Sequence, residues 1–127
     1  MPFSYVVYRE HRLVISTGSA LVTWEEIRER QDQIKTDPEF NPEFNQLVDL
    51  RAVTSVHMTS EQASTLARRT IFSATSNRAF VAANPAVFGV SRMWEILSEM
   101  SNNRSHIRVF YDLTAALNWL NLESLPL

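Results

Sequence analysis

Few residues in this 127-residue chain have the chemistry of a functional site, and Thr59 is the most informative of them. It stands in the segment VDLRAVTSVHMTSEQ, residues 48–62, where an apolar stretch gives way to polar residues. Thr59 followed by Gln62 has the spacing of a capping box, in which the hydroxyl accepts a hydrogen bond from the third residue of a helix. Glu61 would lie in the first turn, where the helix dipole favours a negative charge. The local sequence therefore predicts a helix that begins here, with Thr59 as its cap.

The other role open to Thr59 is that of a phosphoacceptor. A phosphate brings about −1.5 to −2 charge, and its oxygens can meet the free backbone N–H groups at the start of a helix. Phosphorylation would then leave the domain folded and change the charge of a docking face. The sequence leaves both roles open.

The remaining polar residues form no catalytic or metal-binding set in the sequence. The chain has no cysteine, which excludes thiol catalysis, thiolate zinc sites and disulfides. Its three histidines, His11, His57 and His106, lack metal-ligand spacing. With two glycines, it contains no phosphate-binding loop, dinucleotide fingerprint or nucleophile elbow. We therefore expect no enzyme activity, no cofactor and no bound metal.

Several residues have both a functional and a structural interpretation. Asp49 ends an apolar strand, where parallel sheets often bind ligands, or it is a structural carboxylate that accepts hydrogen bonds from nearby N–H groups. Arg68 and Arg69 follow Thr59 on the predicted helix, and they either bind an acidic partner or lie on a solvated face. Phe88 lies opposite the apolar stripe of its own helix. It marks either a partner or homodimer surface, or a ring folded back over a loop.

The elements that position these residues alternate between strands and helices. Stretches rich in β-branched, aromatic and apolar residues predict strands at 3–10, 12–20, 45–51, 78–84 and 106–112. Helices are predicted from Thr23 to just before Pro38, over 60–73, over 84–100 and after Asp112. The order β-β-α-β-α-β-α-β-α predicts a single α/β domain over residues 1–127, with a mixed, mainly parallel sheet of about five strands and four helices. The first two strands form an antiparallel hairpin at or near one edge.

Apolar spacing predicts which side of each helix faces the core. The first helix is expected to bury Trp24, Ile27 and Ile34, with Glu26 and Arg30 paired on its wet side. The inward stripe of the helix over 84–100 is expected to comprise Ala86, Val90, Met93, Leu97 and Met100, broadened by Trp94. The tandem quartet PEFNPEFN, residues 38–45, is expected either to dock Phe40 and Phe44 on the core or to form a binding loop.

Composition limits the partners and the compartment. The net charge is −2 and the charges are mixed along the chain, so there is no basic stripe for a nucleic acid and no Lys/Arg cluster for a membrane surface. No apolar stretch is long enough to span a membrane. The apolar run near the start is too short for a signal peptide. We therefore expect a cytoplasmic protein.

The order of elements and the segment 48–62 resemble the STAS domain family, whose best-known members are anti-sigma-factor antagonists. In that family a strand ending in Asp-Leu leads through a short apolar turn to an Asp-Ser-Ser-Gly motif that opens a helix. Here Asp49-Leu50 end the strand, the turn is expected at 53–56, and His57-Met58-Thr59-Ser60 stand in place of the motif. The chain also resembles an uncharacterised group of small bacterial proteins that share DP-x-F, LVDLR and NP-x-VFG-x-x-RMW segments.

The resemblance implies a protein-interaction module in bacterial signalling. In the antagonists a partner kinase phosphorylates the second Ser of the motif and so controls docking. Thr59 holds that position, His57 that of the Asp and Ser60 that of the Gly. The implied docking face comprises His57, Thr59, Ser60, Arg68 and Arg69, and the partner is a regulator or a kinase.

A small-ligand or lipid-binding domain is the alternative. Sec14-type lipid carriers resemble this chain at the level of the fold alone. This function requires an apolar cavity, which we expect beneath Phe80, Phe88, Met93 and Trp94.

Overall fold

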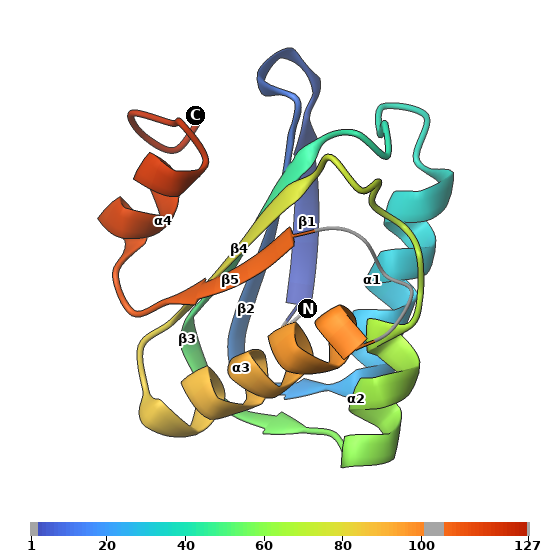
Figure 1. Ribbon diagram of the computed structural model, residues 1–127, viewed down its shortest axis with the longest axis vertical. Helices are drawn as coiled ribbons and strands as arrows, with labels where there is room; N and C mark the ends of the chain where they lie inside the picture. The colour runs from blue at the N-terminus through green and yellow to red at the C-terminus, as the bar shows by residue number, and fades with distance from the viewer. Residues whose placement is uncertain (1–2, 101–105, 127) are drawn as a thin grey trace.

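Five strands in the order β1-β2-β3-β4-β5 form the sheet on which the rest of the chain packs (Figure 1). The computed structural model describes residues 3–100 and 106–126. The strands are β1 (Phe3–Tyr8), β2 (Leu13–Thr23), β3 (Asn45–His57), β4 (Asn77–Ala82) and β5 (His106–Phe110). β1 pairs with β2 in the antiparallel sense, and all other neighbours are parallel. The predicted α/β class and the hairpin at one edge are confirmed.

Four helices cover the two faces of the sheet. α1 (Trp24–Thr36), α2 (Ser60–Ala67) and α3 (Pro85–Met100) lie on one face, and α4 (Leu113–Trp119) lies on the other (Figure 1). A short 3-10 helix, η1 (Arg9–His11), joins β1 to β2. The helix starts follow the predicted signals: Thr23, Thr59 and Asp112 are N-caps, and Pro85 is the first residue of α3. A Pro fits that place because the N–H that it lacks would have no partner within the helix, and its fixed φ suits a helix start.

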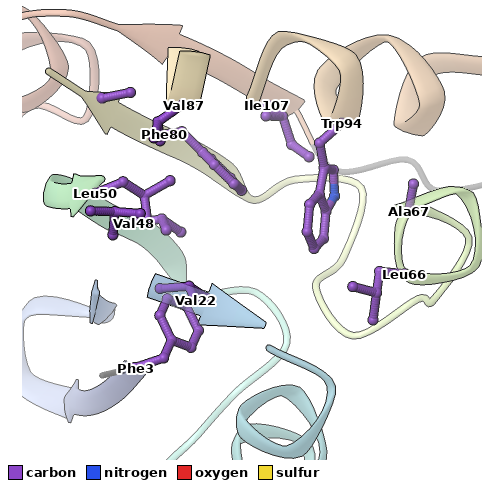
Figure 2. Packing of buried hydrophobic residues seen from close by; sticks show 12 residues of the cluster. Phe3, Val22, Val48, Leu50, Leu66, Ala67, Phe80, Val87, Trp94 and Ile107 are labelled. Atoms are coloured by element: carbon purple, nitrogen blue, oxygen red, sulfur yellow. The ribbon is translucent and has the colours of Figure 1, made fainter. Parts of the chain in front are cut away.

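The largest core cluster lies between the sheet and the three helices α1, α2 and α3. In Figure 2 the indole ring of Trp94, from α3, lies between Phe80 of β4 and the residues Leu66 and Ala67 of α2. Phe80 and Trp94 have ring centres 6.0 Å apart. On the opposite face a second cluster joins β2, β3 and β4 to α4. It comprises Leu13, Leu47, Ala79, Val81, Ala116, Leu117 and Leu120.

The tandem quartet packs as an ordered connection. Phe44 is buried and Phe40 packs against a third cluster beneath α1. The Phe40 ring lies edge-on to both Phe44 and Phe72, at 6.2 and 5.2 Å between ring centres. The prediction that this segment docks its aromatic rings on the core is confirmed.

β3 is longer than the sequence indicated, and the expected turn at 53–56 is wrong. β2 continues to Thr23 and pairs residue by residue with the second half of β3, as far as the pair Thr23 and His57. Two register shifts, between Thr17 and Ser19 and between Ala20 and Leu21, bend this extension. Gly18 lies at the first of them, where an added Cβ would approach a Val53 methyl to 2.8 Å, so a larger residue would have to displace the Val53 side chain.

The inward face of α3 also differs from the predicted stripe. Its buried residues are Val87, Ser91, Trp94 and Ser98, whereas Ala86 is exposed and Met100 is 79% exposed. Ser91 and Ser98 lie on the buried side of α3, and because they are polar a pattern of apolar residues does not identify that side. Ser91 is compatible with burial because its hydroxyl donates to the Val87 carbonyl oxygen at 2.9 Å.

Two further expectations about the helices are wrong. Helix α2 ends at Ala67, not Ser73, because the chain turns there and sends Phe72 into the third cluster. Arg30 is buried and does not pair with Glu26 on the wet side of α1. Its Nε donates to the Phe3 carbonyl oxygen at 2.9 Å, while Glu26 serves the capping box.

Candidate functional site

An open groove lies where α1 and α2 begin, at the carboxyl ends of β2 and β3. It has a volume of about 540 Å³. Strand pairing places Thr23 next to His57, so the two helix starts leave the sheet side by side. The groove is lined by Thr23, Trp24, Glu25, Val56, His57, Met58, Thr59 and Gln62. Two of the predicted docking-face residues, His57 and Thr59, therefore share this surface, and Ser60 is not among its lining residues.

Thr59 caps α2, as the sequence predicted. Its Oγ1 accepts from the Gln62 backbone N–H at 3.1 Å, and Gln62 Oε1 accepts from the Thr59 N–H at 2.9 Å. The residue is exposed, as are His57 and Ser60. The cap accounts for one acceptor position of the hydroxyl and leaves the side chain open to solvent. Its role as a phosphoacceptor stays a prediction.

Thr23 forms a capping box of the same kind at the start of α1. Its Oγ1 accepts from the Glu26 N–H at 3.3 Å, and Glu26 Oε1 accepts from the Thr23 N–H at 3.2 Å. Glu25 and Glu26 occupy the first turn of α1, and Glu61 that of α2. These carboxylates offset the positive ends of both helix dipoles. The groove thus combines satisfied helix starts with polar side chains, and its residues form no nucleophile–base pair.

The structure separates Arg68 and Arg69 from this groove. They follow the last turn of α2, about 12 Å from its start at 1.5 Å rise per residue. Arg68 donates to Ser64 Oγ at 2.7 Å, and Arg69 pairs with Asp32 of α1. Arg69 thus ties α2 to α1, which is a structural task that the sequence did not reveal.

Phe88 belongs to another part of the surface. Its ring is partly buried and stacks on Tyr111 with 3.8 Å between ring centres and 5° between planes. α3 and α2 begin at opposite corners of the lower edge in Figure 1. The structure therefore agrees with the interpretation of a ring folded back over a loop, and it does not bring Phe88 to Thr59.

Asp49 is held by Arg51 in a bidentate ion pair. Arg51 Nε and Nη2 donate to the two carboxylate oxygens at 2.9 and 2.8 Å, and the Arg51 backbone N–H donates at 3.1 Å. Burial alone would raise the pKa of Asp49, but the hydrogen bonds and charge of Arg51 outweigh it and hold the pKa below its usual value. The interpretation as a structural carboxylate is confirmed.

The described residues offer no group of three or more His, Cys, Asp or Glu that could hold a metal ion. His11, His57 and His106 are each exposed. Within residues 3–100 and 106–126, every helix is too short or too polar to cross a membrane.

A second concave feature lies inside the molecule, between the sheet and the helices α1, α2 and α3. This cavity has a volume of about 50 Å³, counted as the space open to the centre of a water molecule. Of the residues expected to form an apolar cavity, Phe80 and Trp94 line it, but Phe88 and Met93 are not among the lining residues. Its wall is mostly apolar, and Val56 and Met58 separate it from the groove.

Buried polar side chains cross the sheet along one wall of this cavity. Arg78 of β4 donates Nε–H to Gln46 Oε1 at 2.8 Å, and Gln46 of β3 donates Nε2–H to Ser16 Oγ of β2 at 3.0 Å. All three residues are at most 6% exposed. Burial lowers the pKa of Arg78 to about 10, which leaves it charged at neutral pH. Its guanidinium lies 4.6 Å from the ring centre of Phe72.

Sequence reasoning missed this polar row. The available signal was weak, because Ser16 interrupts an apolar stretch whereas Gln46 and Arg78 stand at the polar starts of their strands. Only the register of three strands brings them together, because Gln46 and Arg78 are direct partners in the parallel pairing. Arg30 of α1, also buried, completes the polar lining from the helix side.

Comparison with solved structures finds the same fold. The chain is similar to an uncharacterized protein from the DUF3478 family with a SpoIIAA-like fold from Shewanella loihica PV-4, at a TM-score of 0.57 and 13% identity. The match covers 93% of this chain and 91% of that one. No family model matches the chain, and no curated protein matches its sequence. The predicted likeness to STAS-like, uncharacterised proteins is confirmed at the level of the fold.

Proposed function

We propose that this chain, which has the SpoIIAA-like fold, is a non-enzymatic, cytoplasmic protein-interaction module of STAS type. Its docking surface is the groove at the starts of α1 and α2, and its partner is a regulator or a kinase in bacterial signalling. The observation that carries the proposal is the make-up of the groove. Protein interfaces combine an apolar centre, rich in aromatic residues and Met, with a polar rim.

The groove has this division. Trp24, Val56 and Met58 are partly buried and pack against the main core cluster, so their exposed edges form an apolar floor. The polar residues of the rim are Thr23, Glu25, His57, Thr59 and Gln62. A partner side chain that enters would remove the exposed part of Trp24 from water, and Trp is among the residues that contribute most at interfaces.

A phosphoryl group on Thr59 would act on this rim. Its oxygens can accept from backbone N–H groups of the first turn of α2, so the helix start would persist. Two negative charges would then join Glu25 and Glu61 near one surface, which disfavours an acidic partner. This supports a switch in docking rather than in folding.

A photo-crosslinker tests the docking surface. A benzophenone amino acid at Met58, on the groove floor, should give an adduct of defined mass in an extract of the native host. The matched control carries the same group at Val6, which is 52% exposed on β1. We expect the adduct from position 58 alone, and its loss when Trp24→Ala is added. Equal adducts from both positions, or none from position 58, would contradict the proposal.

The phosphoryl switch has its own test. Co-expression with the partner kinase, followed by mass spectrometry, should place phosphate on Thr59. Thr59→Asp, which keeps a capping oxygen and adds a charge, should reproduce the change in crosslinking. Phosphate confined to other residues would end the switch hypothesis and leave the docking proposal standing.

A further inference from the structure

We infer that the interior cavity beneath α1, α2 and α3 binds a small aliphatic carboxylate, with its carboxylate end at Arg78 and its chain directed along β3 towards Leu50. This site lies on the inner side of the wall formed by Val56 and Met58, and the inference is independent of docking at the groove.

The first argument is the polarity gradient along the strands. In the first half of β3 the residues facing the cavity are Gln46, Val48 and Leu50, in that order, and on β4 they are Arg78 and Phe80. The strand starts are polar and the following residues are apolar. Residues two apart on a strand are about 6.6 Å apart, so the gradient runs over roughly 13 Å from Gln46 to Leu50. An elongated occupant with one polar end matches it.

The second argument is charge. Two guanidinium groups, those of Arg30 and Arg78, line the cavity, and among its described lining residues none is acidic. The exposed carboxylate of Glu29, outside the lining, lies 4.0 Å from Arg30 Nη2, so Arg78 is the main positive end of the cavity. Both arginines are 6% exposed. Guanidinium groups in a poorly solvated site favour a carboxylate, which accepts hydrogen bonds with both oxygens. An ammonium group would be repelled there.

The third argument is an unpartnered donor in the wall. Trp94 is 5% exposed, and its Nε1–H has no hydrogen-bond partner among the described residues. A buried donor without a partner carries a desolvation cost that an entering acceptor removes. Gln31 Oε1 also lacks a partner within the described part of the chain, and its amide can turn to present its NH₂ group. A carboxylate offers acceptors only, as Trp94 requires.

Size sets the class of occupant. One water needs roughly 10–15 Å³ of such volume, so a cavity of about 50 Å³ holds more than a single water. It is too small for a two-chain lipid. A short fatty acid is the ligand that combines this size with a negative end and an apolar chain.

Calorimetric titration of the purified full chain with hexanoate tests the inference, and hexylamine is the matched probe of opposite charge. We expect saturable binding of hexanoate and binding of hexylamine weaker by roughly tenfold or more, because a like charge faces Arg78. Equal binding of both probes, or no binding of hexanoate, would overturn the inference; the second result would mean that water alone fills the cavity.

Gln46→Glu locates the carboxylate end without changing side-chain shape. The new carboxylate would accept the hydrogen bond that Arg78 now donates to Gln46 at 2.8 Å, and it would neutralise the positive charge of Arg78. We expect hexanoate affinity to fall by roughly tenfold or more, with melting temperature unchanged or raised. Undiminished affinity in this variant would show that Arg78 does not hold the carboxylate.

Filling the cavity locates the chain of the ligand. Val48→Phe puts a larger side chain into the apolar part and should abolish hexanoate binding. The control is Ile15→Phe, which enlarges a residue on the opposite face of the sheet. It should bind hexanoate as the wild type does. Loss of binding in both variants, or in neither, would refute the placement.

Discussion

Thr59→Ala should destabilise the fold by about 1 kcal/mol, the usual contribution of a side-chain N-cap. In this structure the hydroxyl satisfies the Gln62 N–H at 3.1 Å, and its removal leaves that group to water. An unfolding entropy of about 2.1 cal/mol/K per residue gives roughly 0.27 kcal/mol/K for 127 residues. The melting temperature should therefore fall by about 4 °C. Thermal and urea unfolding followed by circular dichroism measure both quantities.

Three variants separate the cap from the charge. Thr59→Ser and Thr59→Asp each retain an oxygen that accepts from the first turn, so they should stay within about 0.5 kcal/mol of the wild type. Thr23→Ala removes the equivalent box on α1 and should cost a similar amount to Thr59→Ala. A normal melting temperature for Thr59→Ala beside a lowered one for Thr23→Ala would refute the capping argument. So would a Thr59→Asp variant as unstable as Thr59→Ala.

Three further predictions concern residues outside the groove. Burial, and then the hydrogen bond to Asp37, raise the pKa of Tyr5 from 10.0 to about 12. The stabilisation that Tyr5 gives the fold is therefore present below pH 10 and is lost as the pH rises towards 12. Ultraviolet titration should show one phenol that ionises near pH 12 in the wild type and is absent in Tyr5→Phe. Because the pKa of Asp49 is lowered in the fold, Asp49→Asn should reduce the melting temperature at pH 7, and the difference should vanish as acid protonates the carboxyl. Phe88→Ala should lower stability by removing the Tyr111 stack and leave sedimentation velocity unchanged; a wild-type dimer that the variant lacks would instead support a homodimer surface.

Local signals predicted the parts of the fold that local interactions decide. Thr23 and Thr59 with their partners three residues on, and Pro38 beyond the end of α1, mark helix boundaries because caps and prolines act within one turn. The alternation of strands and helices predicted the parallel sheet for the same reason, since each crossover is a local connection.

Residues whose surroundings come from distant segments escaped prediction. The second half of β3 is a strand because β2 extends beside it, which no pattern in 52–57 indicates. The local sequence predicts Arg30 to be exposed. It is buried because the carbonyl oxygen of Phe3, 27 positions away in the sequence, accepts a hydrogen bond from its guanidinium. The cavity depends on the same kind of information, because Gln46 and Arg78 meet only through strand register.

Val56 and Met58 form a partition with one side towards the cavity and the other towards the groove. An occupant that displaces these two side chains from within alters the floor on which an outside protein would rest. Thermodynamic linkage then requires that the outside protein change the affinity of the inner occupant by the same factor. Under the two proposals taken together, a small carboxylate bound inside the chain would change how tightly the chain holds its protein partner.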